Sequence, residues 1–158
     1  EGTRAMVVVT GADGKRKLWA ANEGISSVAV FDIATGIAED YLQVETAITM
    51  FHFRRELDGG DDRVYIGSST THNTDKPTPP GRVYAVNAQT MQIEEEYSMP
   101  GWIHPTGLFV SGRTLYVAEQ KMGAIFTIDI ETKAGKRILS REDLPMLGVV
   151  EGMVGSPC

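Results

Sequence analysis

The alternation of apolar and polar residues follows the same course three times along the chain. Each copy has an aromatic strand, a polar turn and a second alternating strand. The aromatic strands are 18–21, 64–67 and 115–118, and the second strands are 28–33, 83–88 and 125–130. Aromatic and β-branched residues at a period of two favour strands. The pattern therefore predicts a repeated β unit.

Each copy also has a flanking strand on either side. Apolar entry strands precede the copies at 6–9, 48–53 and 107–110, and fourth strands follow them at 37–42, 92–97 and 136–139. The anchors Trp19, Tyr65 and Tyr116 are 46 and 51 positions apart, and the middle copy holds a nine-residue insertion in its Thr- and Pro-rich loop. Four strands at this period are typical of a β-propeller blade. We expect an all-β fold with blades at 5–42, 47–98 and 103–140, and the three anchors packed between sheets.

A short polar residue ends the second strand of every copy, and a threonine follows three positions later. The pairs are Asp32 with Thr35, Asn87 with Thr90, and Asp129 with Thr132. Side chains of this kind accept hydrogen bonds from nearby backbone amides and close turns. We interpret these pairs as turn-forming residues and not as ligands.

The first copy, LWAANEGISSVAVFDIATG, resembles the YVTN-type propeller repeat, and HPTGLFVSGRTLYVAEQKMGAIFTIDIETK is similar to the NHL-type variant. The resemblance covers about residues 5–140. It implies the propeller architecture, whereas such blades serve enzymes, scaffolds and recognition modules alike. The chain departs from the pattern in the loop at 71–81, in the replacement of Asn22 by Ser68 and Glu119 in the later copies, and in having no Trp-Asp signature.

Three blades are fewer than the four to eight of closed propellers. Residues 150–154 echo 105–109, so 148–158 is interpreted as the start of a further blade. We expect a partial propeller within a longer chain, and the second interpretation is a three-blade chain that closes a ring with a copy of itself. In both cases the terminal sheets should expose apolar faces, so the chain alone should not behave as a stable monomer.

The composition of the chain limits the kinds of partner and of cross-link that it can have. The 158 residues are 42% hydrophobic and carry a formal net charge of −6, which argues against a nucleic-acid surface. No apolar run approaches the roughly 18 residues that a membrane helix needs. The single cysteine, Cys158, excludes an internal disulfide. We expect an extracellular, cell-surface or periplasmic protein.

Candidate chemistry is sparse. His52 lies on an entry strand and is interpreted as a packing residue, and His72 lies in the Pro-rich loop. His104 begins an inner strand, where it would line the channel mouth, and Glu151 lies near the start of the further blade, so these two are the channel-mouth binding candidates. A metal site needs three or four convergent ligands, and no Gly-x-Ser-x-Gly elbow or phosphate-binding loop occurs. We predict no catalytic residue, metal or cofactor.

These observations predict a non-catalytic β-propeller module for protein–protein or structural interaction. Its partner would be the remaining blades of the same chain or a second copy in a homo-oligomer. The alternative is a propeller enzyme, such as a lactonase-like hydrolase or a lyase, with its site at the channel mouth. The loop at 71–81 is either a tolerated insertion or a stiff segment that presents a binding feature or O-linked sugars.

Overall fold

The computed structural model describes residues 2–11, 13–22, 27–44, 47–53, 62–69 and 80–143, with the backbone alone for 47–53. Sheet 1 contains β1 (Thr3–Thr10), β2 (Arg16–Asn22), β3 (Ser27–Asp32) and β4 (Ala38–Gln43). Sheet 2 contains β5 (Ala47–Phe53), β6 (Arg63–Ser68), β7 (Arg82–Asn87) and β8 (Ile93–Tyr97). Sheet 3 contains β9 (Pro105–Ser111), β10 (Thr114–Glu119), β11 (Ala124–Asp129) and β12 (Gly135–Leu139).

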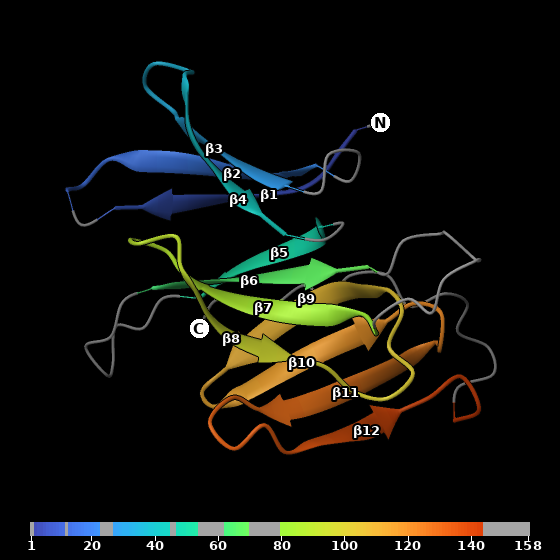
Figure 1. Ribbon diagram of the computed structural model, residues 1–158. Coiled ribbons are helices and arrows are strands. Elements are labelled where there is room, and N and C mark those ends of the chain that lie inside the picture. Colours follow the sequence, from blue (N-terminus) through green and yellow to red (C-terminus); the bar gives the residue numbers. More distant parts are fainter. Residues whose placement is uncertain are drawn as a thin grey trace.

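Each sheet is a simple antiparallel meander in which every strand pairs with its neighbours in sequence. The sheets follow one another face to face along the molecule, from the N-terminal sheet 1 to sheet 3 (Figure 1). Their first strands lie together, since β1 contacts β5 and β5 contacts β9. First strands meet in this way on the inner side of propeller blades. The prediction of an all-β fold with four-stranded sheets is confirmed.

The core consists of two layers of side chains between the sheets. Trp19 of sheet 1 packs against Val64 and Ile66 of sheet 2, and Tyr65 of sheet 2 belongs to the layer shared with sheet 3. Trp19 and Tyr65 are both completely buried, as the repeat predicted. The third anchor, Tyr116, is partly exposed, because it lies on the face of sheet 3 that points away from sheet 2. All three anchors point toward the next sheet along the chain. Tyr116 is uncovered because the described structure has no sheet after sheet 3.

The strand register separates the two faces of sheet 1. Trp19 pairs with Val30, and both side chains face sheet 2 with no exposed surface. Their neighbours Ala20 and Ala29 pair with Met6 and Tyr41 on the opposite, outward face. Successive side chains of a strand point to opposite faces. Each strand of sheet 1 therefore presents apolar residues on both faces.

The turns after β3, β7 and β11 form as the polar pairs predicted. The backbone N–H groups of Thr35, Thr90 and Thr132 donate to the side-chain oxygens of Asp32, Asn87 and Asp129, at 2.8, 3.0 and 2.8 Å. In the third turn, the hydrogen bond from Thr132, together with bonds from Arg113 and Glu131, lowers the pKa of Asp129 to about 2 from its ordinary 3.8. The local sequence thus fixes the turn chemistry in all three copies.

Several predictions fall outside the described residues. They concern most of the loop at 71–81 and the further blade at 148–158. Where the chain is described, it contains no helix with the length and apolar character needed to cross a membrane.

Candidate functional site

His104, the binding candidate nearest the predicted channel mouth, is buried where sheets 2 and 3 meet. It is 8% exposed and directly precedes β9. Its Nδ1 shares a hydrogen bond with the hydroxyl of Ser69, which directly follows β6. The end of a strand in sheet 2 is thereby joined to the beginning of sheet 3. The backbone N–H of Gln120 also donates to the His104 carbonyl at 3.0 Å.

Glu119, the last residue of β10, holds the chain segment that carries His104. Its carboxylate is completely buried and accepts three backbone N–H groups. Oε1 accepts from Ile103 at 3.2 Å and from His104 at 2.5 Å, while Oε2 accepts from Met122 at 2.5 Å. A buried charge is tolerated where donors of this kind replace its water. Glu119 therefore fixes both the approach to β9 and the β10–β11 turn.

In the sequence, Glu119 stands out only as a departure from the repeat. Its equivalents in the other two sheets, Asn22 and Ser68, likewise end β2 and β6. A charged residue in an otherwise apolar strand was the available signal. The partners of the carboxylate come from a loop and a turn that become neighbours only in the folded chain.

The remaining sequence candidates do not join His104 in the described structure. Glu151, His72 and Cys158 lie outside the described residues, as does the side chain of His52. No group of three or more His, Cys, Asp or Glu side chains that could hold a metal ion exists among the described residues. The side chains of Ser69 and His104 are bonded to one another, and that of Glu119 is bonded to backbone N–H groups. Their arrangement suits holding the chain in place more than acid–base chemistry.

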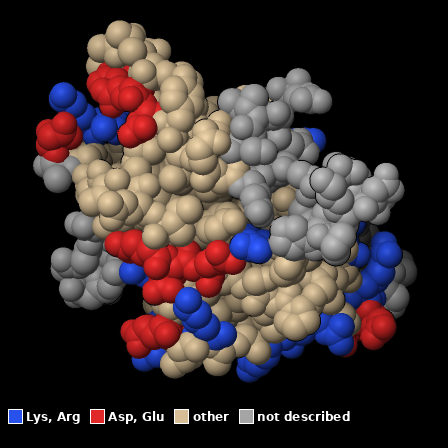
Figure 2. Space-filling view, viewed as in Figure 1, with Lys and Arg blue, Asp and Glu red and all other residues tan. Residues whose placement is uncertain are grey.

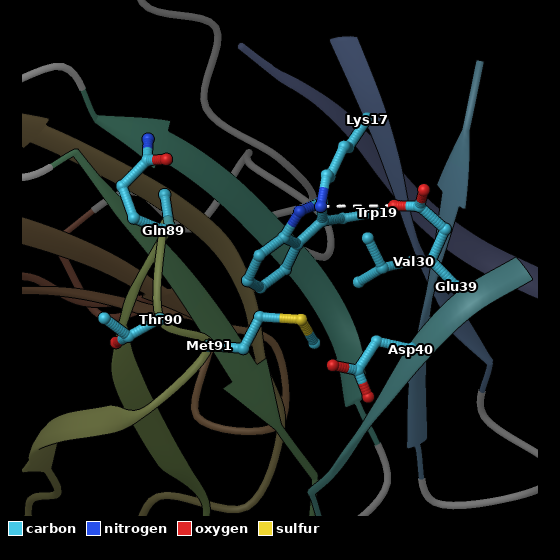
Figure 3. Close-up of a pocket in the computed structure, with 9 residues that line it drawn as sticks. Lys17, Trp19, Val30, Glu39, Asp40, Gln89, Thr90 and Met91 are labelled. Carbon is cyan, nitrogen blue, oxygen red and sulfur yellow. Dashed lines mark ion pairs between the residues drawn. The ribbon is translucent and has the colours of Figure 1, made fainter. Parts of the chain in front are cut away.

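A pocket of about 250 Å³ lies at the opposite ends of the strands, between sheet 1 and the β7–β8 turn (Figure 3). The nine residues that line it come from three strands and this turn. They are Lys17, Trp19, Val30, Glu39, Asp40, Ala88, Gln89, Thr90 and Met91. Trp19, Val30 and Met91 give it an apolar part, and charged and amide side chains give it a polar part.

A β-bulge in β4 directs two consecutive acids into this pocket. Val30 pairs with Asp40 and Phe31 pairs with Ala38, so Glu39 is the extra residue between them. In a regular strand Glu39 and Asp40 would point to opposite faces, and bulges re-aim side chains in this way. Glu39 forms an ion pair with Lys17 at 3.1 Å, drawn as the dashed line in Figure 3.

The comparisons with known proteins bear on the fold. No protein-family model and no curated protein matches the chain in sequence. Among solved structures, it is similar to dihydro-heme d1 dehydrogenase NirN in complex with DHE, with a TM-score of 0.64 at 15% identity over 85% of this chain and 27% of that one. Kuenenia stuttgartiensis hydrazine synthase gives 0.60 at 23% identity, covering 86% of this chain and 35% of that one.

The computationally designed protein Ika8 gives a TM-score of 0.58 at 18% identity, covering 99% of this chain and 41% of the designed one. The chain therefore spans less than half the length of each of these three proteins. NirN and hydrazine synthase are β-propeller proteins. The three meander sheets belong to the same class, and the fold of this chain is that of a β-propeller. The YVTN or NHL repeat type stays a prediction from the sequence.

Proposed function

We propose that the chain is a structural and interaction module of a β-propeller whose terminal sheets pack against further β-sheet. The outward face of sheet 1 carries this proposal. Met6, Val8 and Tyr41 on that face are 62%, 41% and 56% exposed, whereas Trp19 on the covered face has no exposed surface. Contiguous exposed apolar faces mark contact surfaces in soluble proteins. The covered face of the same strands already packs on a sheet.

The outward face of sheet 3 supports the same proposal. The rings of Phe109 and Tyr116 lie 6.1 Å apart on this face, and both side chains are partly exposed. Each end of the three-sheet stack thus presents apolar strands. The partner we propose is β-sheet of the same kind, from the remaining blades of the same chain or from a second copy.

Size-exclusion chromatography with light scattering on residues 1–158 tests the proposal. We expect a dimer or larger species in place of the 17.2 kDa monomer, because water would otherwise cover two apolar sheet faces. Val8→Lys should shift the population toward the monomer, since it places a charge within the outward face. Ile93→Lys is the matched control, because Ile93 is 44% exposed but belongs to β8 of sheet 2.

The two sources of covering sheet give different results in this experiment. A defined dimer that Val8→Lys dissociates supports pairing with a second copy, and heterogeneous aggregation that the same substitution relieves supports cover by further blades. A monodisperse wild-type monomer with a cooperative melt would contradict the proposal. Equal effects of Val8→Lys and Ile93→Lys would place the contact elsewhere.

The alternative is an enzyme on the same ring, with its site at the channel mouth. Two of the similar structures are named as a dehydrogenase and a synthase, and one name includes a heme d1 compound. Among the residues with described side chains, His104 is the one histidine. It is buried, and its Nδ1 is bonded to Ser69. This arrangement does not fit an open axial ligand, so we assign no haem chemistry to the chain. Adding hemin and recording the Soret band tests this directly, and a saturable shift lost in His104→Ala would favour the alternative.

A further inference from the structure

Because the sheets repeat, each residue at the junction of sheets 1 and 2 has an equivalent at the junction of sheets 2 and 3. The β7–β8 turn packs toward sheet 1, and the equivalent β11–β12 turn packs toward sheet 2. Met91 and Lys133 hold the same place in these turns, with φ of 59° and 60°. Their N–H groups each donate at 2.9 Å, to the carbonyls of Asn87 and Asp129 respectively. The side chains of Met91 and Lys133 therefore leave equivalent turns with the same backbone conformation, and each extends toward the preceding sheet.

At the junction of sheets 2 and 3 this position supplies a cation. Lys133 Nζ lies 2.7 Å from Glu95 Oε2 and 5.8 Å from the centroid of the Tyr97 ring. Glu95 pairs with Ala85 in the strand register. All three glutamates of β8 have a cation, since Glu94 pairs with Arg63 and Glu96 with Arg82, at 2.7 and 2.8 Å.

The acidic side chains gathered over β8 in Figure 2 are thus matched by basic groups.

At the junction of sheets 1 and 2 the same site lacks its cation. Asp40 pairs with Val30 as Glu95 pairs with Ala85, but Met91 replaces the lysine. Among the described residues Asp40 forms no ion pair, and its carboxylate accepts only from the N–H of the next residue, at 2.8 Å. Figure 3 shows Asp40 and Met91 facing one another across the pocket. A carboxylate thus lines a pocket where the neighbouring junction has an ammonium group.

The indole N–H of Trp19 is a buried polar group of this pocket. Trp19 is completely buried, and its Nε1–H has no hydrogen-bond acceptor in the described structure. Figure 3 shows this nitrogen at the Lys17 end of the pocket, away from Asp40. A buried donor without an acceptor is unfavourable, and a ligand that supplies one removes the penalty. This observation is independent of the missing cation.

We infer that the pocket between sheets 1 and 2 binds an alkylammonium group, with the ammonium at Asp40 and an oxygen acceptor of the same ligand at the indole N–H of Trp19. The aliphatic stem would lie on Met91 and Val30, which line the pocket between these groups. The ammonium of the ligand would take the place that Lys133 Nζ takes at the next junction. This site does not depend on what covers the outward face of sheet 1.

Two-dimensional ¹H–¹⁵N NMR on the full chain tests the inference, with 4-amino-1-butanol as the probe. The chain has two tryptophans, so the indole signal of Trp19 reports on the pocket and that of Trp102, which lies in the other core layer, is the internal control. We expect a saturable shift of Trp19 alone. Neither n-butylammonium, which lacks the oxygen, nor 1-butanol, which lacks the ammonium, should bind as tightly.

Two variants separate the site from nonspecific binding. Asp40→Asn should weaken binding about 5-fold, a modest loss because the carboxylate is exposed to water. Met91→Lys should abolish binding and raise the urea midpoint, since the new ammonium would pair with Asp40 as Lys133 pairs with Glu95. A folded Met91→Lys protein that still binds the probe overturns the inference.

Free amines and lysine side chains of a partner peptide share this chemistry, and a second probe distinguishes them. Tighter binding of Nα-acetyl-lysinamide than of 4-amino-1-butanol assigns the site to a lysine side chain, and the reverse order assigns it to a small amine. No saturable shift of Trp19 with either probe, or unchanged affinity in Asp40→Asn, overturns the inference.

Discussion

Glu119 and His104 are joined by a 2.5 Å hydrogen bond in which the backbone N–H of His104 donates to Oε1 of a completely buried carboxylate. The same carboxylate accepts from Ile103 and Met122. One side chain therefore fixes the residue that precedes β9 and the turn that follows β10. His104, which the sequence singles out, is therefore held in place by a glutamate for which the repeat pattern predicts no role.

Replacing Glu119 should be among the most damaging single substitutions in sheet 3. Glu119→Ala leaves three backbone donors without an acceptor, and we expect a loss of about 3–5 kcal/mol in the free energy of unfolding. Glu119→Gln keeps one oxygen but places an amide donor against a backbone N–H, so we expect about 2 kcal/mol. Urea denaturation measures both.

Glu96→Ala is the control for this experiment. Glu96 is also a strand glutamate, but it is itself exposed, and its partner, 2.8 Å away, is the partly exposed side chain of Arg82. We expect a loss below about 1 kcal/mol, as for other exposed ion pairs. A similar loss in Glu96→Ala and Glu119→Ala would contradict the structural role of the buried carboxylate.

The three aromatic anchors should differ in their contribution to stability. Trp19→Ala and Tyr65→Ala each remove a completely buried ring, and we expect losses of about 3–5 kcal/mol. Tyr116→Ala should lose less, about 1 kcal/mol, because that ring lies on a partly open face. Chemical denaturation of the three variants checks the order. Equal losses would mean that the outward face of sheet 3 is covered in the isolated chain.

The sequence predicted what local chemistry and strand periodicity determine. The strands and the anchors Trp19 and Tyr65 follow from apolar alternation, and the turn at Asp129 follows from side-chain hydrogen bonds within three residues. The bonds of Ser69 with His104 and of Glu119 with Met122 join segments that sequence spacing does not relate.

The pocket was beyond prediction for a similar reason. Met91 and Lys133 can be aligned in the repeat, but their side chains act on the sheet of the preceding copy. Only the packing of the turn against that sheet shows that Lys133 meets Glu95. The consequence of replacing this lysine by Met91 therefore depends on tertiary contacts that no single repeat contains.

Stability should fall with acid as Asp129 becomes protonated. Hydrogen bonds from Thr132, Arg113 and Glu131 hold its pKa at about 2 in the folded chain, against an ordinary 3.8. A depressed folded pKa contributes stability that is present above the unfolded value and lost as the pH falls through the folded value. The urea midpoint should therefore decline between about pH 4 and pH 2.

Asp129→Asn is the matched variant, because Asn87 forms the same turn at the equivalent place in sheet 2. The variant keeps a neutral oxygen acceptor, so its urea midpoint should change less than that of the wild type over this pH range. Carboxyl ¹³C NMR measures the titration directly. A midpoint for Asp129 near 3.8 would refute the assigned hydrogen bonds.

Gly81 should tolerate no side chain, because the strand β7 begins where the segment before β9 crosses it. A Cβ at this residue would lie 2.9 Å from the carbonyl oxygen of Ile103 and 2.9 Å from Cδ of Pro105. The N–H of Gly81 also donates to the Trp102 carbonyl at 2.7 Å, so the two segments cannot separate without losing that bond. We expect Gly81→Ala to cost about 1–3 kcal/mol in the free energy of unfolding.

Gly2→Ala is the control, because a Cβ at Gly2 meets nothing within 4 Å. It should change the free energy of unfolding by less than about 0.5 kcal/mol. Equal urea midpoints for Gly81→Ala and Gly2→Ala would show that the segment carrying His104 can move away from sheet 2.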